Sequence, residues 1–143
     1  MNYEDVIKHE SLSNMQLAGT LTATEVNELK VQLKTILNAD QTMRQAGIVY
    51  FLITTKPVPR LRGESDIIYI GQSKYTLKDR YQDKIHQECD DYNWRRYEYI
   101  LKECRNPIRI FVTDCLKPAE TEYLLIKRYY NEHLDLPPLN RRG

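Results

Sequence analysis

The chain has 143 residues, which is enough for one ordinary domain with its own core and too short for two comfortable ones. Hydrophobic residues make up 41% and charged residues 29%, a balance that excludes disordered and collagen-like proteins. No stretch approaches the roughly 20 apolar residues of a membrane helix, and the N-terminus lacks the features of a signal peptide. We therefore expect a cytoplasmic protein that has no membrane partner.

The net charge is +1, but it is unevenly distributed along the chain. Residues 1–46 hold 4 Lys/Arg and 6 Asp/Glu, whereas residues 47–143 hold 17 and 14, so the balance shifts from −2 to +3. This is a mild lean toward an anionic partner such as nucleic acid. The cysteines are odd in number and form no CxxC pair, which argues against a disulfide framework and a sulfur-ligated zinc site.

The first half of the chain predicts one helix and two strands. Residues 24–38 place apolar side chains three and four positions apart, which is typical of an amphipathic helix, and Thr22 or Thr24 is its candidate cap. Residues 47–54, GIVYFLIT, and 66–71, DIIYIG, are short runs of β-branched and aromatic residues. The linker between them, KPVPRLRGES, carries Lys56, Arg60 and Arg62, and we expect a basic loop there that contacts phosphate.

The second half predicts helices at 76–88, 93–104 and 118–131 and a third strand at 108–113. Thr76 is the candidate cap of the first of these helices. The order of elements indicates an α/β or α+β fold with a small three-stranded, mostly antiparallel sheet flanked by helices. We divide the chain into an N-terminal helical extension, residues 1–46, and a main domain, residues 47–143.

The main domain resembles the GIY-YIG nuclease family. GIVY at 47–50 and YIG at 69–71 match the two strands that give the family its name, and Arg80, Glu122 and Asn140 follow in the same order and context. The resemblance covers about residues 47–141. The family often has a lysine directly after the YIG glycine, where this chain has Gln72, and a histidine or tyrosine four residues after the arginine, where it has Lys84.

The resemblance implies a DNA endonuclease of restriction or mobile-element type that acts on double-stranded DNA. Tyr50 accepts a proton from water with Tyr69 in hydrogen-bond reach, and nearby cations are expected to depress the pKa of the phenol. Arg80 holds the scissile phosphate through two parallel donors. Glu122 holds one Mg²⁺ or Mn²⁺ ion, a hard cation that keeps several waters.

Two further residues are assigned to this site, and one competitor is excluded. Lys84 shares a helix face with Arg80 and contacts phosphate or a leaving oxygen. Asn140 has a positioning role, in which its side-chain amide forms a hydrogen bond with Tyr50 or with a backbone group. Glu120 is close to Glu122, but two residues rotate a helical side chain by roughly 200°, so both cannot point inward.

Several alternatives remain open at this level. A catalytically silent protein that binds nucleic acid with the same fold is the second hypothesis, favoured by Gln72 and Lys84. Arg95 and Arg96, beside Trp94, are either a nucleic-acid contact or solvated charges flanking a buried ring. The three histidines are predicted at the surface, and the helix at 24–38 is predicted to form a homodimer.

Overall fold

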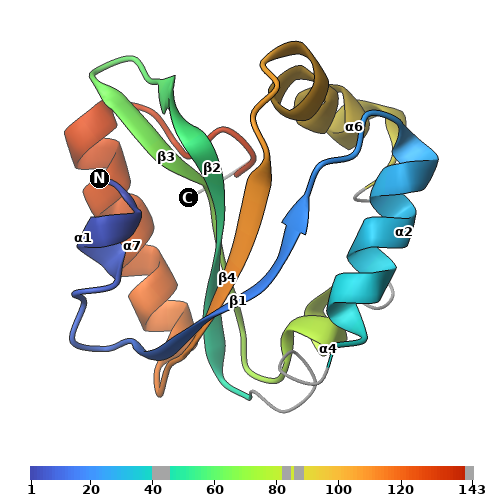
Figure 1. Cartoon of the computed structure of the whole chain (residues 1–143). Coiled ribbons are helices and arrows are strands. Elements are labelled where there is room, and N and C mark those ends of the chain that lie inside the picture. Colours follow the sequence, from blue (N-terminus) through green and yellow to red (C-terminus); the bar gives the residue numbers. More distant parts are fainter. Residues whose placement is uncertain (40–45, 82–84, 86–88, 141–143) are drawn as a thin grey trace.

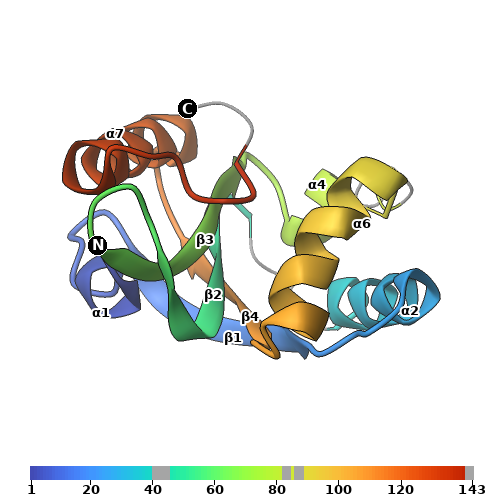
Figure 2. The same cartoon turned by 90° about the horizontal axis from the view of Figure 1, so that it is seen from above.

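The structure, a computed structural model, describes residues 1–39, 46–81, 85 and 89–140. The chain folds as a four-stranded antiparallel sheet with helices on both faces (Figures 1 and 2). The strands lie in the order β1-β4-β2-β3, where β1 is Ser13–Leu21, β2 is Ile48–Pro59, β3 is Glu64–Ser73 and β4 is Ile108–Asp114. The described helices are α1 (Tyr3–Val6), α2 (Val26–Leu37), α4 (Leu77–Tyr81), α6 (Asp91–Glu98) and α7 (Pro118–His133). None of these helices has the length and apolar character needed to cross a bilayer.

The strands β2 and β3 are the two that the sequence predicts at 47–54 and 66–71. Tyr50 lies opposite Gly71 and Leu52 opposite Tyr69, so the GIVY and YIG segments are direct antiparallel neighbours. Both strands extend beyond their predicted ends, because most of the predicted linker pairs within the hairpin. Residues 60–63 alone form the turn between them.

This turn is not the free basic loop that the sequence predicts. Arg60 Nη2 lies 3.2 Å from the Asp135 carboxylate and donates to the Leu136 carbonyl at 2.7 Å. Arg62 Nε donates to the Glu132 carbonyl at 2.8 Å. Both guanidinium groups thus bind the segment at the end of α7, and this segment competes with any phosphate for their donors.

The sheet has a fourth strand that the sequence does not predict. β1 pairs with β4, from Ser13 opposite Asp114 to Leu21 opposite Ile108, with two shifts of register. Most β1 side chains are exposed and show no regular alternation, because β1 is an irregular edge strand. The predicted three strands are therefore four, and the N-terminal extension is not purely helical.

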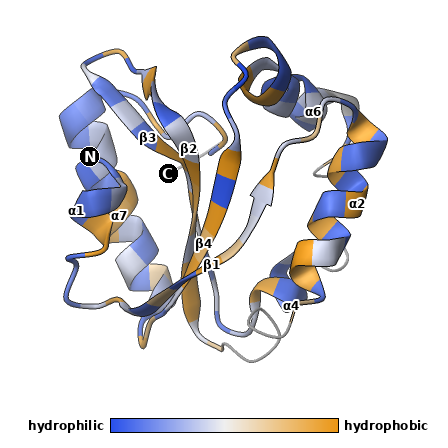
Figure 3. Cartoon of the chain, viewed as in Figure 1, coloured by the Kyte–Doolittle hydropathy of each residue, from blue (hydrophilic) through white to orange (hydrophobic). Residues whose placement is uncertain are grey.

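The core is divided between the two faces of the sheet. Tyr50 and Leu52 pack with α2, α4 and α6 on one face, while Phe51 and Ile70 pack with α7 on the other. Figure 3 shows that β4 and the middle of β2, which lie between these layers, are largely hydrophobic. The helix predicted at 24–38 is confirmed as α2, whose apolar side chains are buried in this core: Leu29, Leu33, Ile36 and Leu37. A homodimer through that apolar face would have to open the core.

The other predicted elements agree with the structure where it describes them. β4 and α7 match the predictions at 108–113 and 118–131, and α7 continues to His133. The helix predicted at 93–104 begins at Asp91 and ends in a π-helical turn, Tyr99–Glu103. Of the helix predicted at 76–88, α4 covers the start, and residues 82–84 and 86–88 lie outside the described residues.

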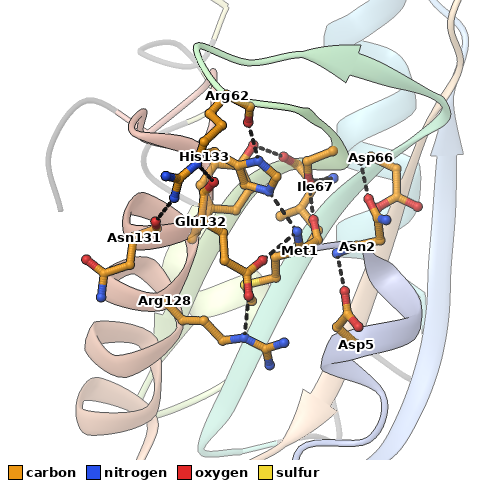
Figure 4. Close-up of polar contacts among 12 residues, drawn as sticks. Met1, Asn2, Asp5, Arg62, Asp66, Ile67, Arg128, Asn131, Glu132 and His133 are labelled. Atoms are coloured by element: carbon orange, nitrogen blue, oxygen red, sulfur yellow. Dashed lines mark hydrogen bonds and ion pairs between the residues drawn. The ribbon is translucent and has the colours of Figure 1, made fainter.

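A polar cluster fixes the first residue against the end of α7 (Figure 4). The Met1 ammonium group lies 2.7 Å from the Glu132 carboxylate and donates to Nε2 of His133 at 2.7 Å. His133 Nδ1 lies 2.9 Å from the Arg62 carbonyl oxygen, which can only accept, so Nδ1 carries the proton and Nε2 is the acceptor. His133 was predicted at the surface, but it is only 5% exposed because it bridges these groups.

Candidate active site

Three tyrosines gather on the face of the sheet that α4 covers. The ring centroid of Tyr50 lies 5.6 Å from that of Tyr69 and 5.6 Å from that of Tyr81, which meets it nearly edge-on at 65°. Tyr50 is 1% exposed and Tyr81 is 8% exposed, whereas Tyr69 is only partly buried. Of the two candidate catalytic phenols, Tyr69 is therefore the one that solvent reaches.

Gly71 makes this close packing of tyrosines possible. A Cβ atom at Gly71 would lie 2.4 Å from Cζ and 2.5 Å from Oη of Tyr50, and 2.7 Å from Cε1 of Tyr69. Contacts below 3.0 Å are essentially never tolerated, so one ring or the strand would have to move. The glycine of the YIG segment is thus a steric requirement of the tyrosine pair.

The environment of Tyr50 is the opposite of the one predicted for a general base. Burial raises its pKa well above the ordinary value, and the charges of Tyr81 and Tyr69, together with hydrogen bonds from both, raise it further. The largest effects on this pKa therefore all disfavour the phenolate, which would lose its hydration on burial. Tyr50 is a neutral phenol at neutral pH, suited to holding Tyr69 in place.

Arg80 lies in α4, a helix whose N-terminus is capped by side chains of the same segment. Thr76 Oγ1 accepts from the Asp79 N–H at 3.1 Å, and the Asp79 carboxylate accepts from the Thr76 N–H at 3.3 Å and its hydroxyl at 2.9 Å. This reciprocal cap satisfies the first backbone donors of α4, as predicted for Thr76. Tyr81 is buried against Tyr50, while the neighbouring Arg80 is partly exposed.

Glu122 and Arg80 come from opposite faces of the sheet and yet influence each other. Burial raises the pKa of the half-buried Glu122 carboxyl, and the Arg80 charge lowers it. The Arg80 charge therefore acts on the Glu122 carboxyl although the two side chains belong to helices on opposite faces of the sheet. Glu120, in contrast, is exposed and lies 3.8 Å from Lys117, so the two glutamates point in different directions as expected.

Asn140 binds the backbone of β3 at Ile70, between Tyr69 and Gly71. Its Oδ1 accepts from the Ile70 N–H at 3.0 Å, and its Nδ2 donates to the Ile70 carbonyl at 2.9 Å. The preceding residue, Leu139, donates its N–H to the Ile68 carbonyl at 2.8 Å. The C-terminal segment thus pairs with the outer edge of β3 on both sides of Tyr69, and Asn140 meets a backbone group rather than Tyr50.

The structure describes one of the two positions that depart from the family pattern, Gln72, and not the other. Lys84 lies outside the described residues. Gln72 follows Gly71 in β3 and lies opposite Val49, and its Oε1 is buried without a donor among the described residues. The Oε1 atom of Gln72 is therefore left with an unused acceptor within the described part of the chain.

The chemistry of Glu122 fits a hard divalent cation. Carboxylate oxygens are the ligands that Mg²⁺ prefers, and the raised pKa shows that burial removes more stabilisation from this carboxylate than Arg80 returns. Within the part of the chain that the structure describes, no group of three or more His, Cys, Asp or Glu side chains could hold a metal. A metal here would depend on one carboxylate, with water and phosphate oxygens completing its shell.

Sequence reasoning did not single out two residues of this site. Tyr81 covers Tyr50, and Gly71 was read only as part of the YIG segment, without its steric role. A signal for Tyr81 exists, because it repeats with Leu77 and Ile85 every four residues, which indicates the inward face of a helix. Nothing local indicates the role of Gly71, since it depends on a ring from the neighbouring strand.

Comparison with known proteins identifies no relative of this chain. No protein-family model matches the chain, and no curated protein or solved structure matches it. Functional inference therefore depends on the motif order and on the geometry of the site.

Proposed function

We propose that this chain is a DNA endonuclease of the GIY-YIG type that hydrolyses phosphodiester bonds with one Mg²⁺ or Mn²⁺ ion. One arrangement supports this proposal. Arg80 is close enough to Glu122 for its charge to lower the pKa of the carboxyl, and its neighbour Tyr81 packs on Tyr50, which packs on Tyr69. A cation, a carboxylate and a phenol pair from four elements, α4, α7, β2 and β3, are thus linked by sequence, packing or charge.

Each side chain has a role that follows from its environment. Arg80 binds the scissile phosphate, because a guanidinium offers two parallel donors to its oxygens. Tyr69 is partly exposed, so its hydroxyl contacts and orients the attacking water, while the neutral, buried Tyr50 holds Tyr69. Asn140 positions Tyr69 through the backbone of Ile70. A metal ion bound by Glu122 would neutralise charge that develops on the phosphate.

The proposal is tested by nicking of supercoiled plasmid DNA in Mg²⁺ or Mn²⁺. Glu122→Gln keeps the shape of the side chain and removes its charge, so we expect cleavage to fall by at least about a hundredfold. Glu120→Gln is the matched control, since it makes the same change two residues away on an exposed carboxylate. Arg80→Lys keeps the charge and loses the paired donors. Equal cleavage by wild type, Glu122→Gln and Arg80→Lys would refute the endonuclease.

A second candidate function is binding of double-stranded DNA without cleavage. One observation favours it: Gln72 stands where the family often has lysine, and its Oε1 is buried without a donor among the described residues. Tight DNA binding without nicking in either metal, over a range of pH, would select this function.

A homodimer remains part of the proposal only through a surface other than the apolar face of α2. One site per chain cuts one strand, so double-strand cleavage by a restriction-type enzyme favours two copies on the DNA. Sedimentation of the protein with duplex DNA would show two copies per duplex if the dimer forms. A single copy that leaves nicked circles as the final product would contradict it.

A further inference from the structure

A second concave site lies between α6, the hairpin turn and the C-terminal segment. It has a volume of about 460 Å³, within the roughly 300–1,000 Å³ of small-molecule sites. Its apolar wall comes from three separate parts of the chain, and includes Val58, Ile100 and Leu139. The pocket is distinct from the tyrosine cluster, because neither Tyr50 nor Tyr69 lines it.

The charged residues that line this pocket are all basic. Arg60, Arg95 and Arg96 line it, and none of its described lining residues is acidic. Arg60 Nη2 is already bound to the Asp135 carboxylate and its Nε is buried without an acceptor among the described residues, so the exposed Arg95 is the arginine that is best placed to meet an anion. A larger pocket of about 560 Å³ elsewhere carries Glu10, Asp114 and Glu120, which would repel an anion.

An aromatic ring stands beside these arginines. Tyr99 lines the pocket, and its side chain is 60% exposed. Arg96 is held in place because it donates to the Pro138 carbonyl, and its guanidinium lies 5.9 Å from the Tyr92 ring centroid. Arg95 is exposed on the same helix. An apolar wall and an accessible phenol ring suit the face of a base, by apolar contact and stacking, and guanidinium groups suit the charge of a phosphate.

The pocket adjoins the candidate active site through the C-terminal segment. Leu139 lines the pocket and donates to the Ile68 carbonyl, and the next residue, Asn140, binds Ile70 on the other side of Tyr69. Along β3, Ser65 lies opposite Val58 of the pocket, and the four residues from there to Tyr69 span about 13 Å. That is the length of roughly four stacked nucleotides at about 3.4 Å each.

We propose that this pocket holds an unpaired nucleotide of the DNA strand that passes through the Tyr69 and Arg80 site. The base lies against Tyr99 and the apolar wall, and the arginines contact its phosphate. The inference rests on the proposed function, because it needs DNA at that site. It adds a preference: DNA with an unpaired nucleotide binds more tightly than fully paired DNA, since a stacked and paired base cannot enter the pocket without unstacking.

The test compares two labelled duplexes by fluorescence anisotropy in EDTA, where cleavage is not involved. One duplex is fully paired, and the other has the same sequence with one central unpaired thymidine. We expect wild type to prefer the second. Tyr99→Ala should weaken its binding by at least about fivefold, the lower limit for loss of one stacked base. Arg95→Glu should weaken it by roughly tenfold and lower its salt dependence.

Matched variants separate the pocket from general effects. Tyr99→Phe keeps the ring and should keep the preference. Lys8→Glu makes a similar reversal of charge beyond α1, on the opposite face of the sheet from α6 (Figure 1), and should affect both duplexes alike. Tyr99 and Arg95 are exposed, so their replacement should leave the thermal midpoint nearly unchanged.

The outcomes divide clearly. The proposal is overturned if wild type binds both duplexes equally, or if its preference survives in Tyr99→Ala and Arg95→Glu. It is also overturned if deoxyadenosine monophosphate alone changes the fluorescence of Trp94, the single tryptophan, while both duplexes bind equally, because the pocket would then take a free nucleotide. A preference that both variants abolish supports the pocket even when the nicking assay shows no cleavage, and in that case only the endonuclease fails.

Discussion

Replacement of Gly71 by alanine tests the packing of the tyrosine cluster most directly. The new methyl carbon would lie 2.4 Å and 2.5 Å from two atoms of Tyr50, whereas nonbonded carbon atoms prefer about 3.5–4.0 Å. The overlap is about 1 Å. Tyr50 cannot move away freely, because it is 1% exposed and packs against Tyr81.

The expected cost follows from this overlap. Added atoms in a well-packed core cost about 1–3 kcal/mol, and this outweighs the roughly 0.5–1 kcal/mol that alanine gains over glycine in regular structure. For a chain of this length, the net loss of about 0.5–2 kcal/mol lowers the thermal midpoint by roughly 2–7 °C. Thermal unfolding followed by far-UV circular dichroism measures the shift, and near-UV spectra report the rearranged tyrosines.

A double-mutant cycle identifies the clash as the cause. Tyr50→Leu removes the ring that supplies two of the three closest contacts, so Gly71→Ala should cost much less in the Tyr50→Leu background than in wild type. Tyr69, the third contact, is partly exposed and is freer to shift. The steric explanation is wrong if Gly71→Ala is neutral, or if it costs the same in both backgrounds.

Substitutions at three further positions have defined effects, each measured by thermal unfolding. Asn140→Ala loses both bonds to Ile70 and should cost about 1–2 kcal/mol, while Asn140→Asp should cost at least as much at pH 7, because a carboxylate oxygen in place of Nδ2 would face the Ile70 carbonyl oxygen, which can only accept. Glu122→Gln should raise the thermal midpoint at pH 7 by about 1–2 °C, because the pKa of Glu122 is raised in the folded state and its charge therefore destabilises the fold at neutral pH. This effect disappears below the pKa of Glu122 in the unfolded chain, where the midpoints of wild type and variant should converge. Glu132→Gln should cost about 1 kcal/mol of stability at pH 7. Burial raises the pKa of Glu132, but the Met1 ammonium and Arg128 outweigh burial and lower this pKa in the folded state. The stabilisation is therefore present above the pKa of the unfolded chain and is lost as the pH falls through the pKa of the folded state.

The fold could be predicted where local pattern and final environment agree. The apolar positions of α2 repeat with the helical period and are the ones it buries, and the runs in β2 and β3 are buried strands. β1 could not be predicted in this way. Its side chains are mostly exposed and its register shifts twice, so its strand conformation depends on pairing with β4, about a hundred residues away in sequence.

The same contrast applies to the site. The order of motifs was sufficient to name Tyr50, Tyr69 and Arg80, but not to predict how deeply each is buried. The depth of Tyr50 depends on Tyr81, which a helix from a later part of the chain brings over it. Burial raises the pKa of Tyr50 in the chain alone, whereas the sequence predicts that Arg80 and a bound metal lower it: the sequence shows which charges are available, but hydration depends on what covers the phenol.

The different burial of Tyr50 and Tyr69 therefore limits what each phenol can do. A group that exchanges a proton with water must touch water, and Tyr50 does not, so any such step falls to Tyr69. Tyr69 is in turn fixed by Tyr50 on one side and by the pairing of Asn140 with Ile70 on the other. Because these supports come from β2 and from the C-terminal segment, damage to either should misplace Tyr69 without removing a reacting group. In the proposed endonuclease, loss of activity after such a change would then measure positioning, because Arg80 and Glu122, the proposed phosphate and metal ligands, would keep their charges.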